Sequence, residues 1–163
     1  MYERKKRNPL TPDAALEQLR SYCAYQDRCH QEVRTRLLEY QVYGDDLEQI
    51  IAELIEERFL DEERFAKSFA RGKFRIKKWG KMKIVRELKS KQISPYCIKK
   101  GMAEIDPEEY YTTLLDLIEK KHATLRETDY YKQRQKLTEH AMRKGFEYEL
   151  IAEAVREVIG PRP

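Results

Sequence analysis

The chain has 163 residues and a formal net charge of +4, and 38% of its residues are charged against 40% that are hydrophobic. Leucine and isoleucine far outnumber valine, and glycine and proline are few, which is typical of a helical protein and argues against an all-β fold. No apolar run approaches the roughly 18 residues of a membrane-spanning helix, so we expect no membrane partner.

The first ten residues are basic, with Lys or Arg at positions 4–7 against a single acidic residue, Glu3. We expect residues 1–10 to form a basic, flexible N-terminal segment. They contain no apolar stretch of the kind that marks a secretory signal, so we expect a cytoplasmic protein. The cysteines, histidines and glycines of the whole chain form no recognised metal-binding, nucleophile or phosphate-binding motif. We therefore expect a non-enzymatic protein without a cofactor.

Capping signals show where helices begin and end. Four residues can cap the first turn of a helix, three of them directly before a proline: Thr11, Asp61, Ser94 and Asp106. Three glycines lie where helices should end: Gly44, Gly145 and Gly160.

A pattern of apolar positions occurs three times along the chain, at intervals of about fifty residues. Its steps of 4, 5, 5, 4 and 3 residues predict a helix, a short turn and a second helix, each with one buried face. The three copies are Val33, Leu37, Val42, Leu47, Ile51 and Leu54; Ile84, Leu88, Ile93, Ile98, Met102 and Ile105; and Leu137, Ala141, Phe146, Ile151, Val155 and Val158.

Another apolar helix precedes each of these helix pairs, so the repeating unit has three helices. We predict an all-α fold of three tandem three-helix repeats over residues 11–59, 60–105 and 106–160. A unit of about fifty residues buries little core by itself, so neighbouring units should pack end to end into an elongated, curved body.

The middle repeat is the strongly basic part of the chain. Residues 71–91 carry ten Lys or Arg against Glu87 alone, and residues 45–64 carry nine acidic residues against two basic ones. A block of this kind is a candidate surface for a polyanion, or for an acidic groove on a protein. A solvated helical face without a binding role has the same pattern.

Two helices, over about residues 62–78 and 81–91, should display this charge. Basic residues recur on the first helix at steps of three and four, which places them on one stripe: Arg64, Lys67, Arg71, Arg75 and Lys78. Four hydrophobic residues should point inward: Phe65, Phe69, Ile76 and Trp79. Gly72 should allow another helix to come close. Seven residues are our candidates for contacting the partner: Lys67, Arg71, Arg75, Lys78, Lys83, Arg86 and Lys89.

The eleven tyrosines could stack on single-stranded bases where they lie beside basic residues. Outside the middle repeat we favour a packing role, in which the ring is buried and the hydroxyl is hydrated.

Several segments resemble motifs of the RecX family of bacterial recombination regulators. Residues 60–66, LDEERFA, resemble the family signature LDDxRFA, and residues 80–88 resemble its GxxRIxxEL segment. Residues 91–93 occupy the place of its KGI, and residues 143–146 match its RGF element. The motif residues in this chain are Leu60, Asp61, Arg64, Phe65, Ala66, Gly80, Ile84 and Leu88. The chain departs from the pattern where Gln41 and Gln92 replace glycines and Lys83 replaces an arginine.

The resemblance implies three tandem three-helix repeats, in agreement with the repeat pattern. It also implies a regulator that binds the RecA recombinase, especially its filament on single-stranded DNA, and inhibits or modulates RecA in recombination, DNA repair and the SOS response. We expect the protein to be a monomer. Single-stranded DNA, and duplex DNA as well, are further partners that it implies. The alternative from the charge pattern alone is a stand-alone helical nucleic-acid-binding protein without a recombinase partner.

Overall fold

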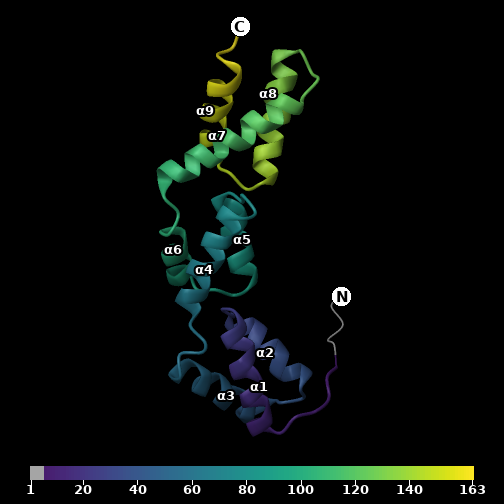
Figure 1. Cartoon of the computed structure of the whole chain (residues 1–163), viewed down its shortest axis with the longest axis vertical. Coiled ribbons are helices and arrows are strands. Elements are labelled where there is room, and N and C mark those ends of the chain that lie inside the picture. Colours follow the sequence, from purple (N-terminus) through teal and green to yellow (C-terminus); the bar gives the residue numbers. More distant parts are fainter. Residues whose placement is uncertain (1–5) are drawn as a thin grey trace.

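The computed structural model describes residues 6–163, and over that range the chain forms nine α-helices and no strand (Figure 1). Repeat 1 consists of α1 (Pro12–Tyr25), α2 (His30–Glu39) and α3 (Gly44–Glu56). Repeat 2 consists of α4 (Glu62–Arg75), α5 (Lys81–Ser90) and α6 (Pro95–Met102). Repeat 3 consists of α7 (Pro107–Thr124), α8 (Tyr130–Arg143) and α9 (Tyr148–Ile159).

The helices of each repeat pack mainly on one another, and the repeats follow one another along the long axis of the molecule (Figure 1). The body is elongated and curved, with its concave side to the right in Figure 1. The predicted fold class is therefore confirmed. None of the helices within residues 6–163 is long and apolar enough to cross a membrane.

The four predicted caps are present. Each cap oxygen accepts a hydrogen bond from the backbone N–H three residues later, at 2.9–3.3 Å. Gly145 and Gly160 follow the ends of α8 and α9 as predicted. The prediction for Gly44 is wrong, because this residue begins α3, and α2 ends instead through the left-handed Gln41 (φ 61°).

Residues 7–10 pack against the end of α2, which the expectation of a flexible segment over residues 1–10 did not anticipate. The backbone N–H groups of Arg7 and Leu10 donate to the carbonyls of Glu39 and Tyr40, and the Arg7 guanidinium lies 2.9 Å from the Glu39 carboxylate. Residues 1–5, which carry the rest of the predicted basic segment, lie outside the described residues.

The apolar repeat positions form the core. All eighteen are buried except Met102 and Val158, which are half-buried. The buried side chains form two separate clusters, one within repeat 1 and one that runs continuously through repeats 2 and 3. Repeats 2 and 3 are therefore one packed body, and repeat 1 has a core of its own.

Two glycines allow repeats 2 and 3 to pack closely, because a side chain at either position would collide with the other repeat. A Cβ on Gly80 would lie 2.3 Å from the Gly145 carbonyl carbon, and one on Gly145 would lie 2.3 Å from the Lys83 Cβ. Because of this contact, backbone carbonyls of repeat 3 accept hydrogen bonds from the free backbone N–H groups at the start of α5. Gly80 donates to the Lys144 carbonyl at 2.7 Å, and Met82 donates to the Gly145 carbonyl at 2.9 Å.

Tyr110 completes the contact between these repeats. Its hydroxyl accepts a hydrogen bond from the Lys81 N–H at 2.9 Å and donates one to Glu147 at 2.8 Å. The ring lies between Phe74 and Phe146, with centroids 5.7 and 5.0 Å away. Burial raises the pKa of Tyr110, so the hydroxyl remains a donor. The buried ring predicted for tyrosines outside the middle repeat is confirmed at this position, but the hydroxyl, which was expected to be hydrated, is buried as well and bonds to protein groups.

Three predictions for the first helix of the middle repeat are wrong. The helix α4 ends at Arg75, so Ile76 does not point inward and is 78% exposed. Lys78 lies beyond the helix in a left-handed turn (φ 58°). Gly72 has open space beside it, and the close approach occurs instead at Gly101, where a Cβ would lie 2.8 Å from the Ala66 carbonyl oxygen.

The glycine contact predicts a specific loss of stability. Gly145→Ala should lower the free energy of unfolding by about 2–5 kcal/mol, because left-handed strain of about 1–2 kcal/mol adds to an overpacking cost of about 1–3 kcal/mol. Gly160→Ala is the matched control, since Gly160 also has a positive φ but faces open space. Urea unfolding measures both variants, and equal losses would contradict the proposed role of the close contact.

Candidate interaction surface

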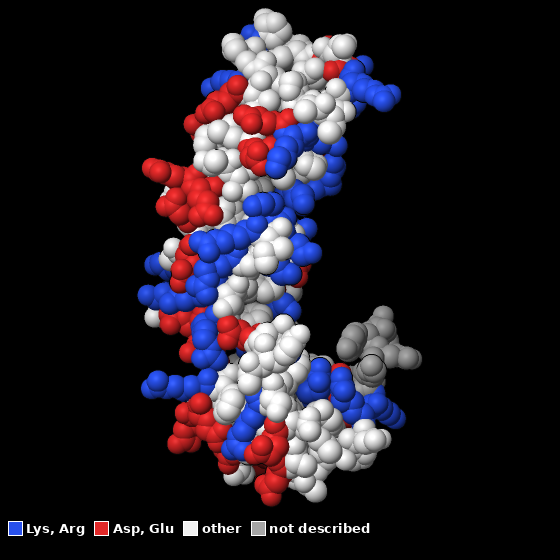
Figure 2. Space-filling model, viewed as in Figure 1, with Lys and Arg blue, Asp and Glu red and all other residues white. Residues whose placement is uncertain are grey.

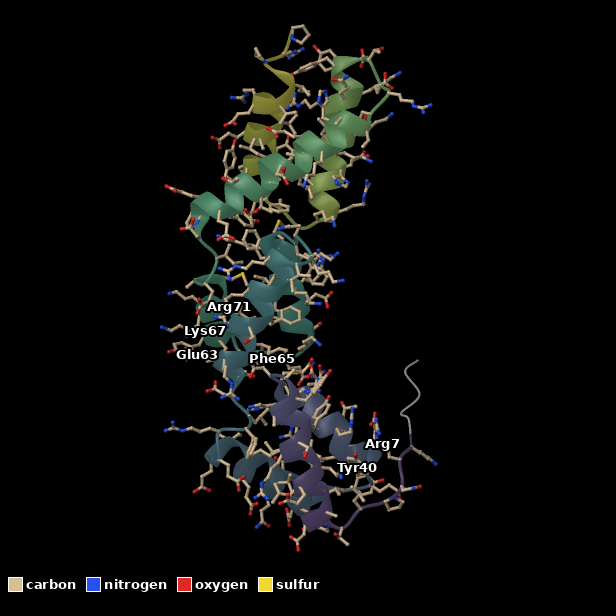
Figure 3. All side chains as sticks on the ribbon, in the orientation of Figure 1. Arg7, Tyr40, Glu63, Phe65, Lys67 and Arg71 are labelled. Atoms are coloured by element: carbon tan, nitrogen blue, oxygen red, sulfur yellow. The ribbon has the colours of Figure 1, made fainter. Side chains whose placement is uncertain are left out.

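The structure separates six of the seven predicted contact residues into two groups, and the seventh, Lys78, lies in the turn between α4 and α5. Lys67 and Arg71 lie on the outer side of α4, with Glu63, whereas Phe65 points to the other side of that helix (Figure 3). Arg75 follows Arg71 by four residues on the same helix and therefore shares its face. Lys83, Arg86 and Lys89 belong to α5, which lies toward the concave side (Figure 1). The single surface that the spacing predicted is therefore two surfaces.

Two residues of the α4 group are paired with acidic side chains. The Arg71 guanidinium lies 3.5 Å from the Glu104 carboxylate, and that of Arg75 lies 3.8 Å from Glu109. Glu104 follows α6 and Glu109 lies in the first turn of α7, so no local pattern in the sequence indicates the pairing. Because each pair offsets a positive charge, this side attracts a polyanion less strongly than its basic residues alone suggest.

The α5 group remains unpaired. Within residues 6–163, Lys83, Arg86 and Lys89 have no carboxylate within 4 Å. Arg86 and Lys89 are exposed, and they line a surface pocket of about 640 Å³ together with Lys81, Met82 and Val85. This face of α5 therefore offers positive charge around an apolar floor.

A third set of residues lies between α4 and α5, and sequence reasoning missed most of it. The Nζ atoms of Lys73 and Lys83 lie 4.9 and 4.5 Å from the centroid of the Trp79 ring. Phe69 packs edge-on to Trp79 at 6.5 Å, and the Lys91 Nζ lies 6.0 Å from the Phe69 ring. We call this set the lysine–aromatic strip: Phe69, Lys73, Trp79, Lys83 and Lys91.

The strip combines the two features that proteins use to bind single-stranded nucleic acid, positive charge and aromatic faces. Phe69 and Trp79 were expected to be core residues, but both are only half-buried. The four-residue step from Phe69 to Lys73 was visible in the sequence, whereas the proximity of Lys91 depends on how α5 packs against α4.

The charge distribution agrees with this assignment. Figure 2 shows Lys and Arg side chains gathered over the middle third of the body, whereas Asp and Glu gather along the edge opposite the concave side and around repeat 1. Among residues 6–163, no three His, Cys, Asp or Glu residues are placed to hold a metal ion.

The motif residues have structural positions. Leu60 is buried in the core of repeat 1, and Asp61 caps α4. Four further apolar motif residues are buried in the core of repeat 2: Phe65, Ala66, Ile84 and Leu88. Gly80 makes the close contact with repeat 3. Arg64 is bound internally, with its Nε 2.8 Å from the Asp27 carboxylate.

The fold and these surfaces define a helical-repeat protein with a basic face on its middle repeat. Two models of RecX three-helix domains match the chain, the second domain at residues 61–102 and the third at residues 108–155. Together they account for more than half of its length. The chain belongs to the RecX family.

Two relatives and two solved structures agree with this membership. The chain is 30% identical over 139 residues to the regulatory protein RecX of Enterococcus faecalis and 27% identical over 138 residues to that of Bacillus cereus. These alignments cover 85% of the chain but only 52% and 51% of the relatives, so the chain spans about half their length.

The crystal structure of RecX from Lactobacillus salivarius superimposes with a TM-score of 0.82 at 21% identity, covering 90% of this chain and 96% of that one. A second RecX crystal structure gives a TM-score of 0.81 at 21% identity and covers 90% and 73% of the two chains. These likenesses support the fold.

The lysine–aromatic strip predicts an unusual quenching behaviour for Trp79, the only tryptophan of the chain. Iodide should quench its fluorescence more strongly than caesium at equal ionic strength, because Lys73 and Lys83 concentrate anions around the ring. The double variant Lys73→Ala/Lys83→Ala should lose this difference, and Lys120→Ala, on repeat 3, should keep it. Equal quenching by both ions in the wild type would show that the ring lies in no positive field.

Proposed function

We propose that this protein regulates the RecA recombinase by binding its filament on single-stranded DNA and restraining its activity. The observation that supports this most strongly is the membership of the RecX family, whose relatives are named regulatory proteins. Basic residues gather on α5 and on the lysine–aromatic strip, where only Lys91 has a carboxylate partner within residues 6–163, and this gives a surface suited to a polyanionic filament. A RecA partner also agrees with the cytoplasmic location expected from the sequence.

In the proposed mechanism the protein catalyses no reaction and acts only by binding different states of the filament with different affinities. A bound regulator shifts a filament between states only as far as its affinities for those states differ. We place the curved body along the filament, with the concave side of repeat 2 toward it, where it bridges neighbouring subunits and hinders strand exchange and ATP turnover. The paired residues Arg71 and Arg75 contribute less in this arrangement than the unpaired Arg86 and Lys89.

Inhibition of RecA ATPase on single-stranded DNA tests this proposal. The wild-type protein should inhibit as it is titrated in, and Arg86→Glu/Lys89→Glu should need about tenfold more protein for the same effect, which corresponds to about 1.4 kcal/mol of lost contact energy. Arg71→Glu/Arg75→Glu, with the same change in charge, should lose less.

The control for net charge is Lys120→Glu/Lys132→Glu on repeat 3, which should inhibit like the wild type. Circular dichroism checks that every variant keeps its helical content. Full inhibition by a folded Arg86→Glu/Lys89→Glu variant would remove α5 from the contact surface. A wild-type protein that leaves RecA ATPase unchanged would overturn the proposal itself.

The lysine–aromatic strip supports direct binding of single-stranded DNA as a component of this function, and as the whole function in the alternative of a stand-alone nucleic-acid-binding protein. With about six phosphate contacts, log K against log[salt] should have a slope of about −4 for an oligodeoxythymidylate. In the double variant Lys73→Ala/Lys83→Ala the magnitude of this slope should decrease by about 1.4, because two phosphate contacts are lost. Fluorescence anisotropy measures both slopes, and a slope near zero would exclude a phosphate-binding surface.

Affinity capture with RecA, with and without single-stranded DNA, separates the two functions. Binding to RecA in either condition, beyond what the DNA alone captures, supports the regulator. Binding to naked DNA and none to RecA would support the stand-alone protein.

A further inference from the structure

The two joints of the body are built differently. Repeats 2 and 3 share one apolar core and the close contact of Gly80 with Gly145. Repeats 1 and 2 have separate cores, and the only residue of repeat 1 in the described chain that joins the core of repeat 2 is Cys29, from the loop between α1 and α2. Hydrogen bonds and ion pairs also connect repeats 1 and 2.

A clasp centred on Asp27 closes one side of this joint. The Asp27 carboxylate accepts hydrogen bonds from the Arg64 Nε at 2.8 Å and from the Ser68 hydroxyl at 2.6 Å. Partial burial alone would raise the pKa of Asp27, but the bonds from Ser68 and Arg64 outweigh it and hold the pKa below its usual value. Arg64 also donates to the carbonyls of Arg58 and Phe59, both at 3.2 Å, which ties the linker to α4.

A second ion pair lies across the same joint. The Lys91 Nζ is 3.5 Å from a carboxylate oxygen of Glu32, and the two side chains are partly exposed, at 28% and 26%. This pair therefore also joins repeat 1 to repeat 2, and salt weakens it as it weakens the clasp.

A groove of about 560 Å³ opens between the two repeats beside these groups. Its walls come from both sides of the joint: Gln26, Asp27 and Glu32 from repeat 1, and Phe65, Ser68, Phe69, Lys73 and Lys91 from repeat 2. The repeats are thus incompletely packed where they meet, and the groove leaves room for one to turn against the other.

We propose that repeat 1 turns as a unit about the linker at residues 57–61 against a rigid body formed by repeats 2 and 3, with the Asp27 clasp holding the closed position. The clasp pair is partly exposed, at 42% for Arg64 and 30% for Asp27, and exposed ion pairs contribute little to stability and are weakened by salt. The hinge therefore opens at high ionic strength while both cores stay intact.

This hinge gives the motif at residues 60–66 a role. Leu60 anchors one end of the motif in the core of repeat 1, and Phe65 and Ala66 anchor the other end in the core of repeat 2. Asp61 starts α4 between them, and Arg64 makes the clasp. The motif is therefore the connection that sets the curvature of the body, and this inference does not depend on the proposed function.

Distance measurement between spin labels on the full chain tests the hinge. Tyr43 on repeat 1 and Tyr148 on repeat 3 are 58% and 53% exposed, so each can be replaced by a ketone-bearing phenylalanine that carries the label without involving the buried cysteines. Tyr96 and Tyr148 form the control pair, because both lie on the rigid body and Tyr96 is 63% exposed.

At low salt, both pairs should give one narrow distance distribution. At about 1 M salt, where the screening length falls to about 3 Å, the Tyr43–Tyr148 distribution should broaden and shift while the Tyr96–Tyr148 distribution stays unchanged. Arg64→Ala should produce the same change at low salt. Arg34→Ala should not, because its ion pair with Glu48 at 2.6 Å lies within repeat 1.

Two results would overturn the hinge. Narrow, unchanged distributions for both pairs in Arg64→Ala and at high salt would show that the joint is rigid. Equal broadening of both pairs would show general loosening of the fold rather than rotation at one joint.

Discussion

The close contact between Gly80 and Gly145 determines how repeats 2 and 3 pack together. It brings repeat 3 near enough for its backbone carbonyls and the Tyr110 hydroxyl to accept the free N–H groups at the start of α5. The first turn of α5 carries Lys81 and Lys83 and has no acidic residue, an arrangement that the helix dipole disfavours. Repeat 3 supplies the hydrogen-bond acceptors that a capping side chain at the start of α5 would otherwise provide. It therefore fixes the position of the helix that carries Arg86 and Lys89.

The same contact divides the molecule into parts with different physical character. Repeats 2 and 3 form one body because their apolar cores are continuous through Phe74, Tyr110 and Phe146. Repeat 1 meets that body through Cys29 and partly exposed polar groups. The basic surface therefore lies on the rigid part, next to the joint at which the curvature can change.

Much of the fold could be predicted from the sequence because its signals are local. Side-chain caps act within one helical turn, and buried faces recur with the helical period, so Asp61, Ser94 and the apolar repeat positions were correctly read. The end of α4 was predicted wrongly, because Lys78 takes a left-handed conformation without the glycine that normally signals a helix end. As a result, Ile76 was placed in the core and Lys78 on the stripe.

The candidate surface was harder to predict, because its charge depends on contacts between distant residues. Arg71 and Arg75 looked as available as Arg86, and only the packing of α4 against α6 and α7 pairs them with Glu104 and Glu109. Arg64 looked like part of the same stripe, but Asp27 binds it from repeat 1.

We propose that the α5 face of repeat 2 contacts the RecA filament. Lysine footprinting tests this contact by comparing the rates at which an amine-reactive reagent modifies each lysine with and without a RecA filament on single-stranded DNA. Lys83 and Lys89 should become protected, while Lys120 and Lys132 on repeat 3 should react as before. Protection of the repeat 3 lysines with none at Lys83 or Lys89 would contradict the proposed contact.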